Sequence, residues 1–288
     1  EIHVERHDLE SARAFLAHGR ELGEGLGLPQ NPYRLRVVAA RLKQVEGDWE
    51  EALGLLDEAE PRYTNDFSPA VRPIGALKAR TWLAQSRLKK TADWARDRSL
   101  SSDDELSYQH EFEHLTLARM LVAQGRQARS NQVLVEALTL LDRLHEAAES
   151  GGRSGSVIES LLLQALAHHA RGDVHTAVLT LDHALQCARP EGYIRVFMDE
   201  GTPLVQLMRV AAERGLQTGA VGQALAGLAS SEPPRVPDVA MRYSRVETAL
   251  IEPLSPRELD VLRLLKTELS GPEIARELVI GLSTVRTY

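Results

Sequence analysis

The chain has 288 residues, of which 43% are hydrophobic and only 5% aromatic, and its net charge is −7. Its single cysteine, Cys187, cannot form an internal disulfide, which excludes a disulfide-stabilised secreted scaffold and favours a cytoplasmic protein. No run of about 18 uncharged apolar residues is present, which argues against a transmembrane helix and a membrane partner. Taken alone, the excess of acidic residues also argues against nucleic-acid binding.

The composition and the hydrophobic pattern predict an all-α fold. Ala, Leu, Glu and Arg are abundant and aromatic residues are few, which favours helix over sheet. Between Ile158 and Ala170 the apolar residues follow helical spacing, and no segment alternates apolar and polar residues for long enough to predict a strand. A first helix is expected from about Asp8 to Leu22.

Four short turns with similar sequences indicate an internal repeat. Their third residues, Gly47, Ser86, Gly125 and Gly172, lie 39, 39 and 47 residues apart. A helix is expected to end at each of these positions, where a left-handed backbone costs Gly little, and a second helix is expected to fold back. Small side chains follow five residues later and apolar ones nine residues later: Ala52, Thr91, Ser130 and Ala177, then Leu56, Ala95, Leu134 and Leu181.

These repeats predict a tetratricopeptide-like solenoid of helical hairpins over residues 1–229. Its spacing exceeds the usual 34 residues, so longer helices or loops are expected. The first helix resembles the second member of a hairpin, so the array is expected to begin upstream of Glu1. Further along the chain we expect loops at 61–73 and 150–155, an irregular cap at 193–197, and helices at 203–214 and 220–229.

A proline-rich linker is predicted at residues 230–253, because Pro233, Pro234, Pro237 and Pro253 cannot lie inside a helix. Residues 254–288 then contain two capping boxes, one beginning at Ser255 and one at Ser270. A third helix is expected to begin near Leu282. Two short helices joined by a tight turn, the second with hydroxyls and a cation at its start, are typical of a helix-turn-helix.

The segments LSPRELDVLRLL and LSGPEIARELVIGLSTVRTY closely resemble the LuxR-type helix-turn-helix. The upstream segments DELSYQHEFEHLTLARMLVAQGR and ARPEGYIRVFMDEG resemble the repeat region of the large MalT-like ATP-dependent regulators. By this resemblance Arg286 and Thr287 correspond to base-contacting positions, and Ser283 and Thr284 to phosphate or first-turn contacts. Tyr288, which replaces the family's usual His, completes the predicted DNA-binding set. The recognition helix is cut short at Tyr288, so this chain is expected to bind DNA weakly or not at all.

The resemblance implies a transcription regulator, expected to be an activator, whose repeats sense an inducer or partner. Promoter DNA, RNA polymerase or a regulatory protein, and a small molecule or protein on the concave face are the implied partners. ATP is implied only for a module upstream, because no G-x-x-x-x-G-K-[ST] motif occurs in this chain. No cofactor, metal or catalytic residue is predicted here, and the chain is not expected to be an enzyme.

Two alternatives are open at this stage. The segment from His110 to His114 fits the H-E-x-x-H zinc pattern, although it also fits an ordinary repeat helix and lacks an obvious third ligand. The chain could also be a non-catalytic helical-repeat adaptor whose DNA-binding end is vestigial. The charge count does not oppose DNA binding by the terminal segment. Residues 254–288 carry five basic and five acidic side chains, so the whole −7 belongs to the repeats and linker.

Overall fold

The computed structural model describes residues 2–26, 30–63, 70–215 and 276–278. The chain divides into two compact units, Glu1–Pro234 and Arg235–Tyr288. The described residues are helical with no strand among them, which confirms the all-α prediction for that part of the chain. The predicted helix at 220–229, the linker at 230–253 and all but residues 276–278 of the helix-turn-helix lie outside the described residues.

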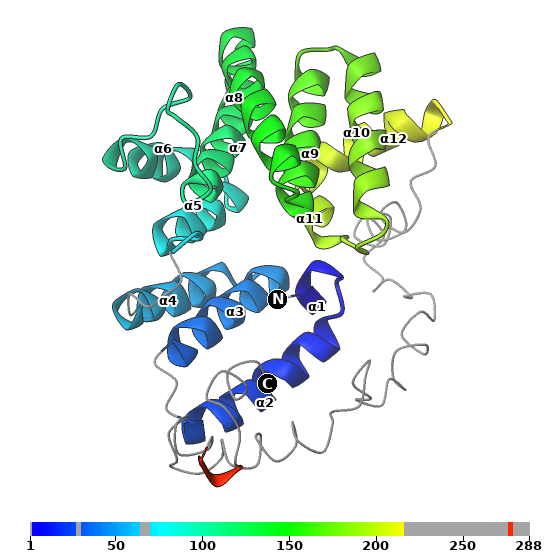
Figure 1. Ribbon diagram of the computed structural model, residues 1–288. Helices are drawn as coiled ribbons and strands as arrows, with labels where there is room; N and C mark the ends of the chain where they lie inside the picture. The colour runs from blue at the N-terminus through cyan, green and yellow to red at the C-terminus, as the bar shows by residue number, and fades with distance from the viewer. Residues whose placement is uncertain (1, 27–29, 64–69, 216–275, 279–288) are drawn as a thin grey trace. The chain divides into compact units, whose positions relative to one another are not determined.

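The first unit is built from successive helical hairpins, as the repeats predict (Figure 1). The four hairpins pair α3 with α4, α5 with α6, α7 with α8, and α9 with α10. The elements are α1 (Ile2–Glu5), α2 (Leu9–Leu26), α3 (Asn31–Glu46), α4 (Trp49–Ala59), a 3₁₀ turn (Glu60–Arg62), α5 (Ile74–Ala84), α6 (Leu88–Asp97), α7 (Glu111–Ala128), α8 (Asn131–Ser150), α9 (Ser154–Ala170), α10 (Val174–Ala188), α11 (Arg195–Met198) and α12 (Thr202–Glu213).

The connections between helices differ in detail from those expected. The loop expected at 61–73 begins with the 3₁₀ turn, and its residues 64–69 lie outside the described part. The loop expected at 150–155 is shorter, because α9 already begins at Ser154. The cap after α10 contains the short helix α11, and α12 begins close to the expected Pro203.

Three of the four predicted turns adopt the left-handed backbone that ends a helix. Gly47, Ser86 and Gly172 have φ values of 80°, 58° and 83°. The next residue is the N-cap of the following helix, and at Asp48 the side chain accepts a hydrogen bond from the Glu51 amide at 3.2 Å. This capping satisfies an amide that would otherwise lack a partner at the start of α4.

The predicted turn at Gly125 is wrong. Helix α7 continues through this glycine to Ala128, and the left-handed residue is Arg129, with φ 51°. A Cβ at Gly125 would lie only 2.7 Å from Leu134 Cγ of α8. The glycine is therefore required by close approach of two helices, and not by a turn.

When Arg129 replaces Gly125 as the turn residue of the third hairpin, the four left-handed turn residues lie 39, 43 and 43 apart. In this alignment the third hairpin has a large and a small side chain at two positions where the other hairpins have the reverse. Five residues after the left-handed position the first, second and fourth hairpins have a small or medium side chain, whereas the third has Leu134. Four residues before it the third hairpin has glycine, whereas the others have large side chains. The residues are Ala52, Thr91, Leu134 and Ala177, and Lys43, Trp82, Gly125 and His168. The bulk of Leu134 is accommodated by the missing side chain of Gly125.

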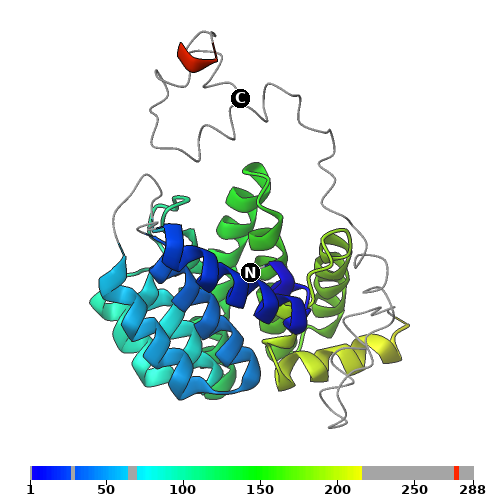
Figure 2. The same cartoon turned by 90° about the horizontal axis from the view of Figure 1, so that it is seen from below.

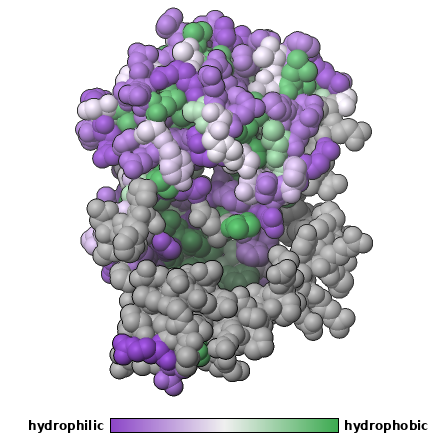
Figure 3. Space-filling model, viewed as in Figure 1, coloured by the Kyte–Doolittle hydropathy of each residue, from purple (hydrophilic) through white to green (hydrophobic). Residues whose placement is uncertain are grey.

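The core of the first unit lies between the layers of helices. Its largest cluster of buried apolar residues extends from α5 to α12, and the fully buried Phe197 of α11 and Leu207 of α12 belong to it. The face of the repeats visible in Figure 3 is mostly hydrophilic. No helix in the described ranges has both the length and the apolar character needed to cross a bilayer.

The helices of the first unit curve so that α1 and α11 meet (Figures 1 and 2). The Ile194 amide, just before α11, donates a hydrogen bond to the Glu5 carbonyl of α1 at 2.9 Å. Arg6 Nε donates to the Glu191 carbonyl at 3.0 Å. The second of these contacts joins residues that are 185 apart in sequence.

Candidate functional site

The predicted DNA-binding residues Ser283, Thr284, Arg286, Thr287 and Tyr288 lie outside the described residues, so their role stays a prediction. The candidate site described below belongs to the first unit. It consists of polar groups on the first helices of the hairpins and on the segment that joins α11 to α12.

Polar side chains connect the first helix of each hairpin to the next. Gln44 Nε2 of α3 donates to Thr81 Oγ1 of α5 at 2.8 Å. Arg80 Nε of α5 donates to Thr116 Oγ1 of α7 at 2.9 Å. The first helices of successive hairpins therefore carry a strip of polar contacts.

At the centre of this strip four charged side chains form what we call the charge cluster: Arg80, Arg119, Glu159 and Glu200. Glu159 of α9 bridges both arginines, with Oε1 at 2.9 Å from Arg80 Nη1 and 2.8 Å from Arg119 Nη2. Arg119 of α7 also pairs with Glu200, which lies between α11 and α12. The cluster has equal numbers of positive and negative groups, so its net formal charge is zero.

Burial and pairing act against each other in the charge cluster. Burial favours the neutral acid of Glu159, but the charges of Arg80 and Arg119 outweigh it and lower its pKa to about 2. Burial raises the pKa of Glu200 above its ordinary value despite the opposing charge of Arg119. Burial also lowers the pKa of Arg80 to about 10, although Glu159 opposes the shift. The ion pairs therefore compensate the desolvation of Glu159 more completely than that of Glu200.

The charge cluster leaves some donors unused within the described part of the chain. Arg80 Nη2 and Arg119 Nε are buried without a hydrogen-bond partner. The guanidinium of Arg80 lies 3.8 Å from the centroid of the Phe112 ring, a cation–π contact that partly replaces its lost hydration. Ion pairs therefore fix both arginines in position, although each arginine keeps one buried nitrogen without a hydrogen-bond acceptor.

A second ionic contact, which we call the interlock, joins the two ends of the first unit. Arg41 of α3 pairs with Asp199, and with Glu5 of α1 at 3.5 Å. Arg195 Nε also donates to Asp199 at 2.6 Å. Burial would raise the pKa of Asp199, but the charges of Arg41 and Arg195 hold it below its ordinary value. We call the segment between α10 and α12, which includes α11, the C-terminal cap. Its adjacent residues Asp199 and Glu200 attach it to α3 and to α7, respectively.

Substitution of Asp199 by Asn is expected to loosen the interlock, because Arg41 and Arg195 would lose the carboxylate that they share. The amide of Ile194 is expected to exchange with deuterium about tenfold faster, since the contact between α1 and α11 opens more often. Hydrogen exchange followed by mass spectrometry measures this. The control is Asp93→Asn, which removes the exposed ion pair with Arg96 and should leave exchange at Ile194 unchanged.

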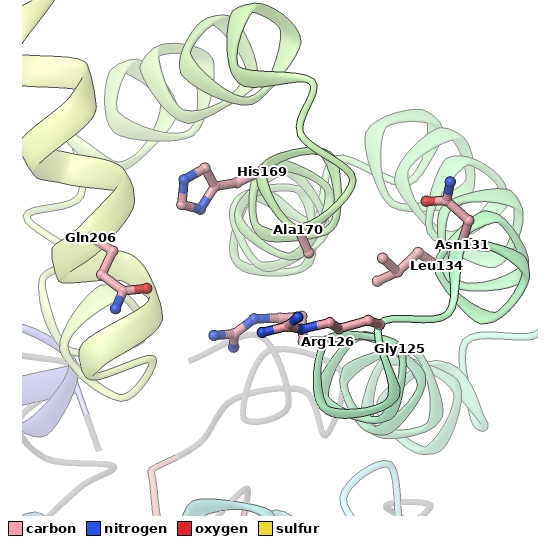
Figure 4. A pocket seen from close by; sticks show the side chains of 8 residues that line it. Gly125, Arg126, Asn131, Leu134, His169, Ala170 and Gln206 are labelled. Atoms are coloured by element: carbon pink, nitrogen blue, oxygen red, sulfur yellow. The ribbon is translucent and has the colours of Figure 1, made fainter.

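A pocket of about 350 Å³ lies beside the charge cluster, between the ends of α7 and α9, the start of α8 and the middle of α12. Figure 4 shows the side chains of Arg126, His169 and Gln206 directed into this space. Its lining residues are Gly125, Arg126, Arg129, Asn131, Leu134, His169, Ala170 and Gln206, with no carboxylate among them.

The zinc alternative is not supported by the placement of its two histidines. His110 lies just before α7, with Nδ1 at 2.9 Å from Glu113 Oε2. Both ring nitrogens of the buried His114 are engaged, Nδ1 with the His110 carbonyl at 3.0 Å and Nε2 with Asp104 at 3.2 Å. No cluster of three metal-ligating side chains occurs within the described ranges. The segment from His110 to His114 forms the start of the repeat helix α7, which was the alternative to a zinc site.

The charge cluster, the interlock and the pocket are not predicted by the sequence patterns. One signal was available for Glu159, which stands next to the apolar residues that begin the helical pattern at Ile158. A charged residue on a face otherwise expected to be buried indicates a paired charge. Its partners could not be found in this way, because Arg80 and Arg119 are 79 and 40 residues away.

The family described as the MalT-like TPR region matches residues 1–214, which include every helix of the first unit described above. No curated protein and no solved structure matches the chain.

Proposed function

Because the chain belongs to the family of the MalT-like TPR region, we propose that it is part of a transcription regulator that works in the cytoplasm. Its repeats bind an inducer or a regulatory partner, and its terminal segment binds promoter DNA. In this function the chain acts by binding and carries out no catalysis. The nucleotide chemistry that the resemblance implies would belong to another module.

The observation that carries the proposal is the double attachment of the C-terminal cap through Asp199 and Glu200. Asp199 contacts Arg41 of the first hairpin, whereas Glu200 contacts Arg119 of the third. A ligand that changes the spacing of these hairpins must therefore alter at least one contact of the cap. Helix α12 follows the cap directly and leads along the chain to the terminal motif, which gives a covalent route from the repeats to the DNA-binding residues.

Chromatin immunoprecipitation tests the DNA-binding part of this proposal. A copy of the gene tagged at its natural locus is expected to enrich a small set of promoters. Arg286→Ala and Thr287→Ala are expected to abolish the enrichment, because they remove predicted base contacts. The control is Arg209→Ala, which removes an exposed arginine of α12, outside the terminal motif, and should leave enrichment unchanged.

Two results would contradict the proposal. Equal enrichment by Arg286→Ala, Thr287→Ala and the parent protein would show that these side chains do not contact DNA bases. Absence of promoter enrichment, together with stable co-purification of a partner protein that depends on the repeats, would support the adaptor interpretation instead.

A further inference from the structure

The pocket is lined by two arginines, Arg126 and Arg129, and the acidic charge that acts on Arg126, that of Glu200, lies outside the lining. Neither Arg126 nor Arg129 makes a side-chain hydrogen bond or an ion pair within the described residues. Arg126 is only partly exposed, so its guanidinium has lost part of its hydration without gaining a carboxylate. By contrast, five other partly exposed arginines of the first unit each pair with a carboxylate: Arg41, Arg80, Arg119, Arg153 and Arg195.

We propose that this pocket, with Arg126 and Arg129 as its charged groups, is a binding site for a small phosphorylated molecule. A guanidinium presents its N–H groups in a planar fork that matches two oxygens of a phosphate, so two arginines can hold one doubly charged group. The imidazole of His169 and the amides of Asn131 and Gln206 add neutral hydrogen-bonding groups for the rest of the ligand. The volume of about 350 Å³ is at the lower end of the range of ligand pockets, which favours a small metabolite over a polymer.

The electrostatic surroundings of the pocket support an anion. Burial lowers the pKa of Arg126 and the charge of Glu200 only partly offsets this, so a negatively charged ligand would stabilise its charged form. Burial and the charge of Arg126 both lower the pKa of His169, which leaves its ring neutral at pH 7.5 and able to donate or accept a hydrogen bond. Glu200 itself is occupied by Arg119 and does not line the pocket.

A ligand in this pocket would contact both α7 and α12. Arg126 lies on the same helix as Arg119, seven residues or about two turns further on, and Gln206 lies on α12, which follows the cap. An anion held by Arg126 and Gln206 would also weaken the electrostatic attraction between Arg126 and Glu200. This inference depends on the proposed function only in identifying the bound molecule as an inducer, because anion binding is measured without DNA.

Isothermal titration calorimetry of the whole chain with inorganic phosphate and with pyrophosphate, at low ionic strength, tests the site. Saturable single-site binding is expected, stronger for pyrophosphate because it carries more charge and more acceptor oxygens. Arg126→Gln and Arg129→Gln are each expected to weaken binding about tenfold or more, since each removes one guanidinium and its charge-assisted hydrogen bonds to the ligand. Arg126→Lys should recover part of the affinity, because it keeps the charge and loses the planar fork.

The matched control is Arg209→Gln, which removes an exposed arginine of α12 that does not line the pocket, so its dissociation constants should equal those of the parent. Arg129 is exposed, so Arg129→Gln tests the site even if Arg126→Gln disturbs the packing of α7. Circular dichroism of each variant checks its fold. Absence of saturable binding, or equal weakening by Arg129→Gln and Arg209→Gln, would overturn the proposal, whatever the outcome for promoter binding.

Discussion

Replacement of Glu159 by Gln is expected to destabilise the first unit by about 3–5 kcal/mol, the range found when one member of a buried ion pair is removed. Glu159 bridges Arg80 and Arg119, and it is the carboxylate that Arg80 contacts in the charge cluster. Without it, Arg80 would remain buried with only neutral partners, namely the new amide, the Thr116 hydroxyl and the Phe112 ring. Denaturant unfolding followed by circular dichroism measures the loss.

Two variants separate this effect from a general loss of acidic charge. Glu200→Gln is expected to cost less, because Arg119 would keep Glu159 and because burial already raises the pKa of Glu200. Glu146→Gln, at an exposed position of α8, should change the free energy of unfolding by no more than about 0.5 kcal/mol. If Glu159→Gln were no more harmful than Glu146→Gln, the charge cluster would not stabilise the fold.

The same substitution gives a test by pH. The pKa of Glu159 is about 2 in the folded protein, below its ordinary value of 4.5, so its stabilising contribution is present above pH 4.5 and is lost as pH falls toward 2. The difference in unfolding free energy between the parent and Glu159→Gln is therefore expected to shrink over this interval. A difference that stays constant between pH 5 and pH 2 would contradict the ionised bridge.

Replacement of Gly125 by Ala is expected to destabilise the first unit by about 1–3 kcal/mol, the usual cost of overpacking. This is opposite to the effect of Ala in an unobstructed helix, where it is favoured over Gly by about 1 kcal/mol. The added Cβ would lie 2.7 Å from Leu134 Cγ and 2.8 Å from its Cδ2, so α7 and α8 must separate or Leu134 must change rotamer. Thermal or denaturant unfolding measures the change.

A double-mutant cycle tests the explanation. Leu134→Ala alone should cost about 2–5 kcal/mol through the cavity that it leaves. Adding Gly125→Ala to it should then cost nothing further or restore stability, because the new methyl group fills space vacated by Leu134. The control is Gly54→Ala in α4, where a Cβ would meet no atom within 4 Å and the substitution should stabilise. Additive costs in the double mutant would show that the two residues do not exclude each other.

The sequence by itself determined the all-α class of the described residues and three of the four hairpin turns of the first unit. Helical spacing of apolar residues, and the left-handed turns at Gly47, Ser86 and Gly172, depend on residues close together in the chain, so they can be predicted locally. The resemblance to the MalT-like repeats also rests on local sequence patterns, and the family match over residues 1–214 confirms this resemblance. The DNA-binding residues near Tyr288 follow from the terminal motif alone and stay predictions.

The tertiary structure decided the role of Gly125 and the partners of the buried charges. In the sequence Gly125 looks like the end of a helix. The structure shows instead that a glycine is needed there because Leu134 of α8 packs against it, and a local sequence pattern does not reveal that contact. Likewise Arg119 and Glu200 are 81 residues apart, and Arg41 and Asp199 are 158 apart. Which charges meet depends on how the hairpins stack and curve. Because that curvature is a sum over all the helix contacts, only the folded structure shows that α1 meets α11 and that Arg126 forms no ion pair among the described residues.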